Sequence, residues 1–153
     1  MDLTDLRDGL NAAVPFNRHL GIELTALEPG RCEARLPDRA EQHNHIHSQH
    51  AGALFTLADA ASGGAFVSGM AKRIAELRPL VRRATIEYTN VAHGPITAHA
   101  TVNGLNDALQ SLDRDGRANL TVHISLGDAK GTQVARAEFE WNVKQPTPAS
   151  QRR

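Results

Sequence analysis

One stretch of the chain limits the possible folds more than any other. Residues 51–70 contain no proline and only one charged residue, Asp59. Apolar and small residues occupy nearly every side of this run at helical spacing, which predicts a buried helix. A run of about 20 residues also suits a membrane span, but a carboxylate at mid-bilayer costs several kcal/mol. We therefore expect a central core helix that carries one acid and is capped by Ser48.

Short alternating segments surround the predicted helix. Residues 22–26 and 32–36 alternate between apolar and polar and are separated by Pro29-Gly30, which predicts a β-hairpin. Four more segments alternate in the same way, and Tyr88 and Trp141 fall on their apolar faces: 84–89, 96–102, 118–126 and 135–143. A helical turn is expected near Ala108. A sheet with one apolar face needs a cover, and the long helix is the only sizeable one in the sequence. The sequence thus predicts an α+β hotdog fold, an antiparallel sheet of five to six strands wrapped around one long central helix.

Length, charge and cysteine content favour a simple domain organisation. The chain has 153 residues, with 17 basic and 17 acidic side chains, so no charge excess favours nucleic acid or a membrane surface. The single cysteine excludes a disulfide within the chain, and the first residues lack the features of a signal peptide, so we expect a cytoplasmic protein. We predict one domain over residues 1–144, with an N-terminal helix in residues 1–15 that Pro15 ends, and a disordered tail over residues 145–153.

Two features of the central helix point to chemistry. A carboxylate on an apolar helix is costly unless it is paired, so Asp59 is either a structural residue or poised for catalysis, and the residues leave both open. Free amides at a helix start favour a developing oxyanion, and Asn44 and His50 place donors beside that point. Asp59 lies eight residues after Ala51, about 12 Å along a helix. One helix cannot present both groups to one carbonyl, whereas the antiparallel helix of a two-fold partner can complete the site.

The same residues carry a family resemblance. Asn44, His50 six residues later, Ala51-Gly52 and Leu57-Ala58-Asp59 together resemble the signature of PaaI-type hotdog acyl-CoA thioesterases, and the likeness runs from about residue 16 to residue 144. The resemblance implies that Asp59 activates water or attacks the thioester, that the Ala51 amide polarises its carbonyl, and that Asn44 and His50 position carbonyl or water. The family usually has glycine where this chain has Ala51, but alanine keeps the amide. The chain is most similar to an uncharacterised thioesterase-like branch.

The resemblance also implies a substrate and an assembly. We expect an acyl-CoA substrate, a homodimer or a dimer of dimers, and no cofactor other than the coenzyme A of the substrate, with no metal. Phe55 and Ser62 on the helix are predicted to contact the substrate. Arg82, Arg83 and Arg117 are predicted to bind the phosphates of coenzyme A, with a solvated basic edge as the alternative.

Several alternatives stay open at this point. A hotdog fold also serves dehydratases and hydratases, as well as modules that bind acyl-CoA without catalysis. An acyl-carrier protein could replace coenzyme A as the carrier. His43, His45 and His47 alternate just before His50, so several imidazoles could face a metal ion. No cysteine pair or His-Glu-x-x-His pattern accompanies them, which favours a solvated or subunit-contact loop.

Overall fold

The computed structural model describes residues 2–146. Its helices and strands follow in chain order: α1 Leu3–Ala13, α2 Pro15–Leu20, β1 Glu23–Glu28, β2 Arg31–Leu36, α3 Ala51–Gly69, β3 Arg78–Tyr88, β4 Ile96–Asn103, α4 Leu105–Asp115, β5 Arg117–Gly127 and β6 Gln133–Lys144. Two short 3-10 turns lie at Ala40–Gln42 and Ile74–Glu76. Most of the predicted tail, residues 147–153, lies outside the described residues.

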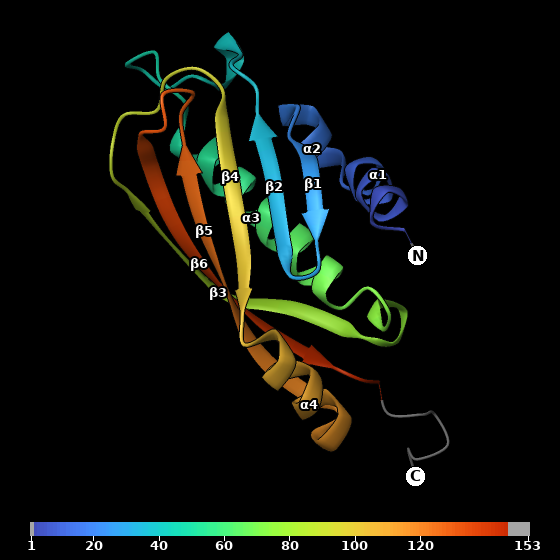
Figure 1. Cartoon of the computed structure of the whole chain (residues 1–153). Coiled ribbons are helices and arrows are strands. Elements are labelled where there is room, and N and C mark those ends of the chain that lie inside the picture. The colour runs from blue at the N-terminus through green and yellow to red at the C-terminus, as the bar shows by residue number, and fades with distance from the viewer. Residues whose placement is uncertain (1, 147–153) are drawn as a thin grey trace.

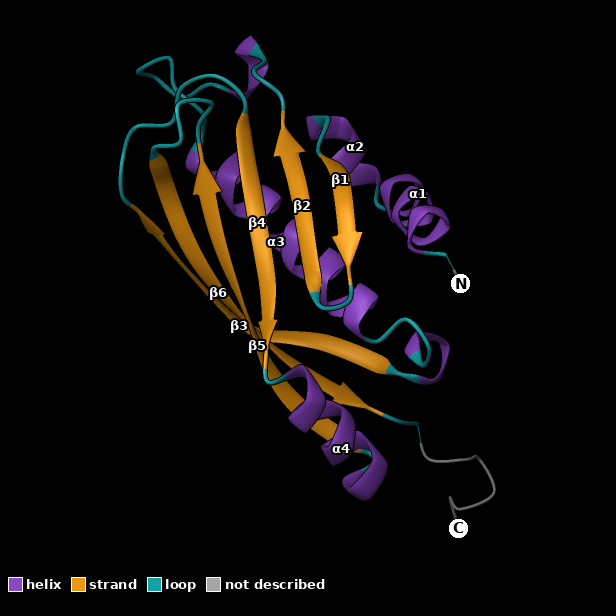
Figure 2. Ribbon diagram, in the orientation of Figure 1, coloured by secondary structure: helices purple, strands orange, loops and turns teal. Residues whose placement is uncertain are grey.

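All six strands form one antiparallel sheet in the order β1-β2-β4-β5-β6-β3. The sheet curves around α3, which runs along its inner side (Figure 1 and Figure 2). The predicted α+β hotdog fold is confirmed, with six strands. Within the described residues, no helix combines the length and the hydropathy that crossing a lipid bilayer requires.

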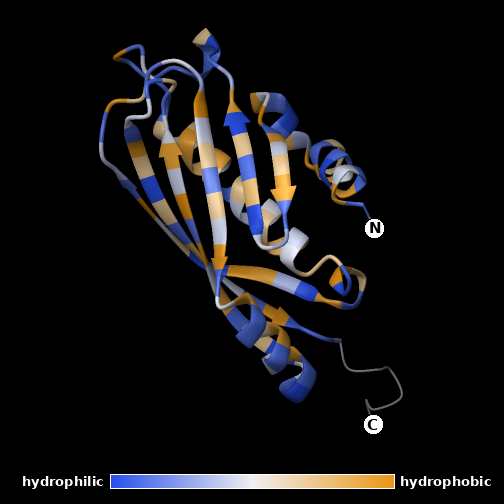
Figure 3. Ribbon diagram, viewed as in Figure 1, coloured by the Kyte–Doolittle hydropathy of each residue, from blue (hydrophilic) through white to orange (hydrophobic). Residues whose placement is uncertain are grey.

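The core lies between α3 and the inner face of the sheet. Side chains along β4 and β5 alternate between buried and exposed, a pattern that Figure 3 shows as alternating colours along the strands. On α3, Leu57, Ala61 and Phe66 are fully buried. Strands β4 and β5 therefore turn their apolar side chains toward the helix and their polar ones toward solvent, because successive side chains of a strand point to opposite faces.

The two edge strands of the sheet, β1 and β3, differ in whether a side chain pairs with their outer backbone groups. Along β1, Asn11 of α1 accepts a hydrogen bond from the Leu24 amide at 2.8 Å and donates to the Leu24 carbonyl at 3.1 Å. This side chain occupies backbone groups that would otherwise stay unpaired. Within the described residues, β3 pairs only with β6, so its second edge is open.

The N-terminal helix ends before Pro15, as predicted, and Pro15 also begins a second short helix, α2, because the first position of a helix needs no amide hydrogen. Two other local predictions were wrong. The turn expected near Ala108 is an eleven-residue helix, α4. Tyr88 is 47% exposed rather than buried. It lies at the end of the edge strand β3, while α3 packs mainly on β1, β2, β4 and β5.

Candidate active site

Helix α3 begins at Ala51, with His50 as its N-cap instead of the predicted Ser48. The Gly52 amide donates to Nδ1 of His50 at 2.8 Å. Because a ring nitrogen that accepts a hydrogen bond carries no proton, the proton of the neutral imidazole is on Nε2. The His50 amide donates to the Gln42 carbonyl at 2.9 Å. His50 is thus held at the helix start, and its Nε2–H group remains as a hydrogen bond donor.

Ser48 belongs instead to a loop that Asn44 organises. The Asn44 side-chain oxygen accepts from the amides of Ile46 and Ser48, both at 3.1 Å, and its nitrogen donates to the Ser48 hydroxyl at 2.9 Å. His47 adopts a left-handed conformation in this loop, with φ of 58°. Asn44 and Ala51 line the same hollow, so the structure brings these two predicted site residues together.

The Ala51 amide is the unpaired donor at this helix start. The His50 carbonyl accepts from amides of the following turn, and the Gly52 amide is bound to His50. The Tyr88 hydroxyl donates to the Ala51 carbonyl at 3.0 Å. Among residues 2–146 the Ala51 amide has no acceptor, and Ala51 is exposed. A free amide at the positive end of a helix favours an oxygen that gains negative charge.

Asp59 lies two turns further along α3, between Ala58 and Ala60, which are both buried. Asp59 itself is exposed, and its side chain has no ion pair or hydrogen bond partner within residues 2–146. Partial burial raises the pKa of the Asp59 carboxyl above its ordinary value. A carboxylate without a partner and with a raised pKa is a candidate base or nucleophile. It is about 12 Å along the helix from Ala51 of the same chain, so these two groups do not meet within one chain.

The two helix residues predicted to contact substrate differ in their surroundings. Phe55 is half-buried, and its ring centre lies 5.5 Å from that of Phe139. Ser62 is fully buried, and its hydroxyl accepts a hydrogen bond from the Trp141 indole at 2.8 Å. The Trp141 ring also stacks on Phe66. In this conformation Ser62 connects the helix to β6, and contact with a substrate stays a prediction.

The predicted phosphate-binding arginines fall in two places. Arg82 and Arg83 line one hollow with Asn119 and Trp141. Arg83 forms an ion pair with Glu140 at 2.7 Å, which neutralises its charge. Arg117, at the start of β5, does not line this hollow.

Arg117 belongs to a row of three cations across the sheet. Lys144 of β6 is paired in register with Arg117 on one side and with Arg78 of β3 on the other. All three are exposed, and none forms an ion pair with another described residue. We name these residues the cation row. Arg78 belongs to the basic run between Lys72 and Arg83 in the sequence, but sequence analysis missed Lys144, because strand register decides which side chains are neighbours.

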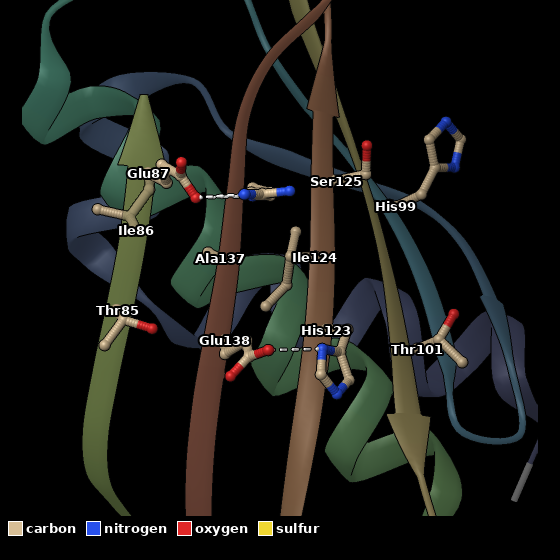
Figure 4. A pocket seen from close by; sticks show the side chains of 11 residues that line it. Thr85, Ile86, Glu87, His99, Thr101, His123, Ile124, Ser125, Ala137 and Glu138 are labelled. Carbon is tan, nitrogen blue, oxygen red and sulfur yellow. Dashed lines mark hydrogen bonds and ion pairs between the residues drawn. The ribbon is translucent and has the colours of Figure 1, made fainter. Parts of the chain in front are cut away.

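A third hollow, of about 740 Å³, lies on the outer face of the sheet and contains none of the predicted site residues (Figure 4). His123 and Glu138 pair across two strands at 3.2 Å, and Arg136 pairs with Glu87 at 2.7 Å. The charges of Arg136 and Glu87 on this face therefore neutralise each other.

The histidine-rich loop gives no support to a metal site. His43 pairs with Asp38 at 2.6 Å, and His45 and His47 are exposed. Within residues 2–146, no group of three or more His, Cys, Asp or Glu side chains is placed to hold a metal ion.

Comparison with known proteins places the chain in a family. The family described as a domain of unknown function, DUF4442, matches residues 5–143. The chain belongs to this family. The DUF4442 protein is similar to a Pseudomonas aeruginosa crystal structure described as a protein of unknown function and probable thioesterase. The two are 26% identical, with a TM-score of 0.84 over 95% of this chain and 97% of that chain.

A second solved structure confirms the fold of the DUF4442 protein. The Escherichia coli PaaI protein, from the phenylacetic acid degradation operon, is 19% identical, with a TM-score of 0.74 over 95% of this chain and 94% of that chain. The resemblance to PaaI-like hotdog proteins is confirmed. No protein with a curated description matches the DUF4442 protein significantly.

Proposed function

We propose that the DUF4442 protein hydrolyses the thioester of an acyl-CoA to the free acid and coenzyme A. The observation that carries this proposal is the unpaired Ala51 amide on the helix that also bears Asp59, a carboxylate without a partner among residues 2–146. A thioester carbonyl gains negative charge on attack and needs a donor, while water needs a base. The similarity to a probable thioesterase supports this chemistry.

The proposed site is completed by a second copy of the chain. Ala51 and Asp59 are too far apart on one helix, but an antiparallel α3 from a partner would place its carboxylate opposite the first copy's amide. The open edge of β3, where Leu80 is 64% exposed, supports pairing of this strand with its own copy. We propose a homodimer as the smallest active unit, with a dimer of dimers as a further assembly.

The proposed reaction uses three groups at this junction. The Ala51 amide donates to the thioester carbonyl oxygen, and the neighbouring Nε2 proton of His50 is a second donor. The Asp59 carboxylate of the other copy either takes a proton from attacking water or attacks the carbonyl carbon itself. On the first route, the carbon–sulfur bond breaks to give the free acid, and the coenzyme A thiolate takes up the proton that Asp59 removed from water. On the second route, the thiolate leaves and takes up a proton from solvent, and water then hydrolyses the acyl–Asp59 anhydride to the free acid and restores the carboxylate. Asn44 shapes the loop beside the amide, and Gly52 maintains the cap on His50.

The cation row is the part of this chain best suited to the phosphates of coenzyme A. Like charges that face each other in register repel, and an anionic group between them would offset this repulsion. Arg82 and Arg83 are the second candidates, although Glu140 already neutralises Arg83. A phosphopantetheine group on a carrier protein would present the same thioester with fewer phosphates.

The test is free-thiol release from aryl, short-chain and long-chain acyl-CoAs by three proteins. Asp59→Asn removes the base and should lower turnover by about 10²–10⁴-fold. Ala51→Pro replaces the amide hydrogen with the ring Cδ atom and should keep the helix, because proline is well tolerated at the first position of a helix and the extended His50 can precede it. We expect a loss of about 10²–10³-fold from this change. Unchanged turnover in either variant would remove that group from the mechanism.

The same experiment separates the alternatives. A hotdog module that only binds acyl-CoA would leave every thioester intact while the wild-type chain still bound it. A dehydratase or hydratase would change the acyl chain and release no thiol.

A further inference from the structure

A hollow of about 390 Å³ adjoins the free Ala51 amide. It lies between the loop at residues 44–48 and residues 88–92, which comprise the end of β3 and the segment after it. Small-molecule sites occupy about 300–1,000 Å³. Three exposed apolar side chains line this hollow: Ile46 is 54% exposed, Tyr88 47% and Val91 55%. Exposed apolar side chains gathered around a hollow favour an apolar ligand.

The lining of this hollow also excludes one class of ligand. None of its residues carries a charge at neutral pH: Asn44, Ile46, Ser48, Gln49, Ala51, Leu54, Tyr88, Thr89, Asn90, Val91 and Ala92. A charged group that entered it would lose water without gaining an opposite charge. The hollow therefore suits an uncharged apolar group next to the thioester carbonyl.

Tyr88 connects the hollow to the helix start. Its ring lines the hollow, and its hydroxyl donates to the Ala51 carbonyl at 3.0 Å. On the other side, the Gly52 amide is bound by His50, and the His50 amide by the Gln42 carbonyl. Ala51, which offers the free amide, is thus held in place by Tyr88 of the sheet on one side and by His50 of the loop on the other. Partial burial raises the pKa of Tyr88, so its hydroxyl keeps its proton.

We infer that Tyr88 is a positioning and specificity residue, an inference that rests on the thioesterase function proposed above. Its hydroxyl positions the Ala51 amide for the thioester carbonyl. Its ring, with Ile46 and Val91, binds an uncharged apolar acyl group in the hollow. The substrates are therefore aliphatic or aryl thioesters rather than thioesters with a terminal carboxylate.

Substitutions at Tyr88 separate its two roles. Tyr88→Phe keeps the ring and removes the hydroxyl, and we expect kcat to fall about tenfold with KM little changed, as for one lost positioning hydrogen bond. Tyr88→Ala should raise KM for hexanoyl-CoA and phenylacetyl-CoA about fivefold or more. Wild type should prefer both substrates to succinyl-CoA by at least about tenfold. Phe16→Ala is the matched control, since Phe16 is an aromatic residue 59% exposed on α2.

A purely structural role would give a different result. If Tyr88 only fastens α3 to the sheet, Tyr88→Phe will lower the midpoint of urea unfolding and leave kcat and KM at their wild-type values. That outcome overturns the inference and leaves the proposed hydrolysis intact.

A measurement without turnover tests the hollow independently. Tyr88 is the single tyrosine of the chain, so labelling only the ε carbons of the tyrosine ring with carbon-13 gives an aromatic NMR signal that comes from this residue alone. We expect the non-hydrolysable thioether hexyl-CoA to shift that signal, and free coenzyme A to leave it in place. A shift in a chain that hydrolyses no thioester would refute the proposed function and keep the hollow as an acyl-binding site. No shift at saturating hexyl-CoA, or no binding of it, overturns the inference.

Discussion

At the scale of single residues, Gly64 shows how closely α3 packs on the sheet. A Cβ atom added there would lie 2.5 Å from Sγ and 3.1 Å from Cβ of Cys32 on β2. Burial raises the pKa of the Cys32 thiol to about 12, so it fills space as a neutral group. We expect Gly64→Ala to lower the free energy of unfolding in urea by about 1–3 kcal/mol.

Gly9 provides the control for this substitution. It lies in α1 with no heavy atom within 4 Å of an added Cβ, so Gly9→Ala should raise the free energy of unfolding by about 0.4–1 kcal/mol. If Gly64→Ala proved as stable as the wild type, the described contact between α3 and β2 would be wrong.

The ionised Asp59 carboxylate should lower the free energy of unfolding by an amount that can be measured. Its raised pKa means that the folded state holds the proton more tightly than the unfolded state does. The free energy of unfolding should therefore fall as pH rises from the ordinary pKa of 3.8 through the raised value, and stay lower above it. Asp59→Asn does not lose stability in this way. The free energy of unfolding of this variant minus that of the wild type should therefore be larger at about pH 7 than at about pH 3. Equal differences at both pH values would show that the carboxylate is not desolvated.

The same shift predicts the pH dependence of activity. Catalysis requires the ionised carboxylate, so turnover should fall as pH is lowered through the raised pKa. The acid limb of the rate profile should thus lie above the range of an ordinary aspartate.

At the scale of elements, the cation row joins the ends of β3, β5 and β6. If it binds the phosphates of coenzyme A, Arg117→Ala should raise KM for an acyl-CoA about fivefold. It should not change KM for the matching N-acetylcysteamine thioester, which has the same acyl group and no phosphate. Lys72→Ala, a change at an exposed cation outside the row, is the control. Equal effects on both thioesters would point to a structural role for Arg117.

At the scale of the whole molecule, a site shared between two copies predicts complementation. Ala51→Pro and Asp59→Asn should each be inactive alone. When the two chains are unfolded together and refolded in equal amounts, half of the dimers contain one of each, and one of their two sites is intact. Activity should return to about a quarter of wild type. No recovery, in mixtures shown by mass to contain heterodimers, would mean that both groups act within one chain.

Local periodicity in the sequence by itself determined most of the fold. The spacing of residues 51–70 predicted α3, and period-two alternation predicted the strands and the inner faces of β4 and β5, because both patterns depend only on near neighbours in the chain. The Asn44, His50 and Asp59 spacing pointed to the helix start and its acid. The assignment of Asp59 to catalysis stays a prediction.

Only the tertiary structure decided which side chains meet. Ser48 was the predicted cap of α3, but Ser48 bonds to Asn44 in the loop, and His50 caps the helix. Ser62 was predicted to contact the substrate, yet its hydroxyl is occupied by Trp141, which lies on a strand 79 residues later. Strand order turned Tyr88 outward on an edge and brought its hydroxyl to Ala51. Such contacts join residues far apart in sequence, and their partners are set by strand order and register, which no local pattern encodes.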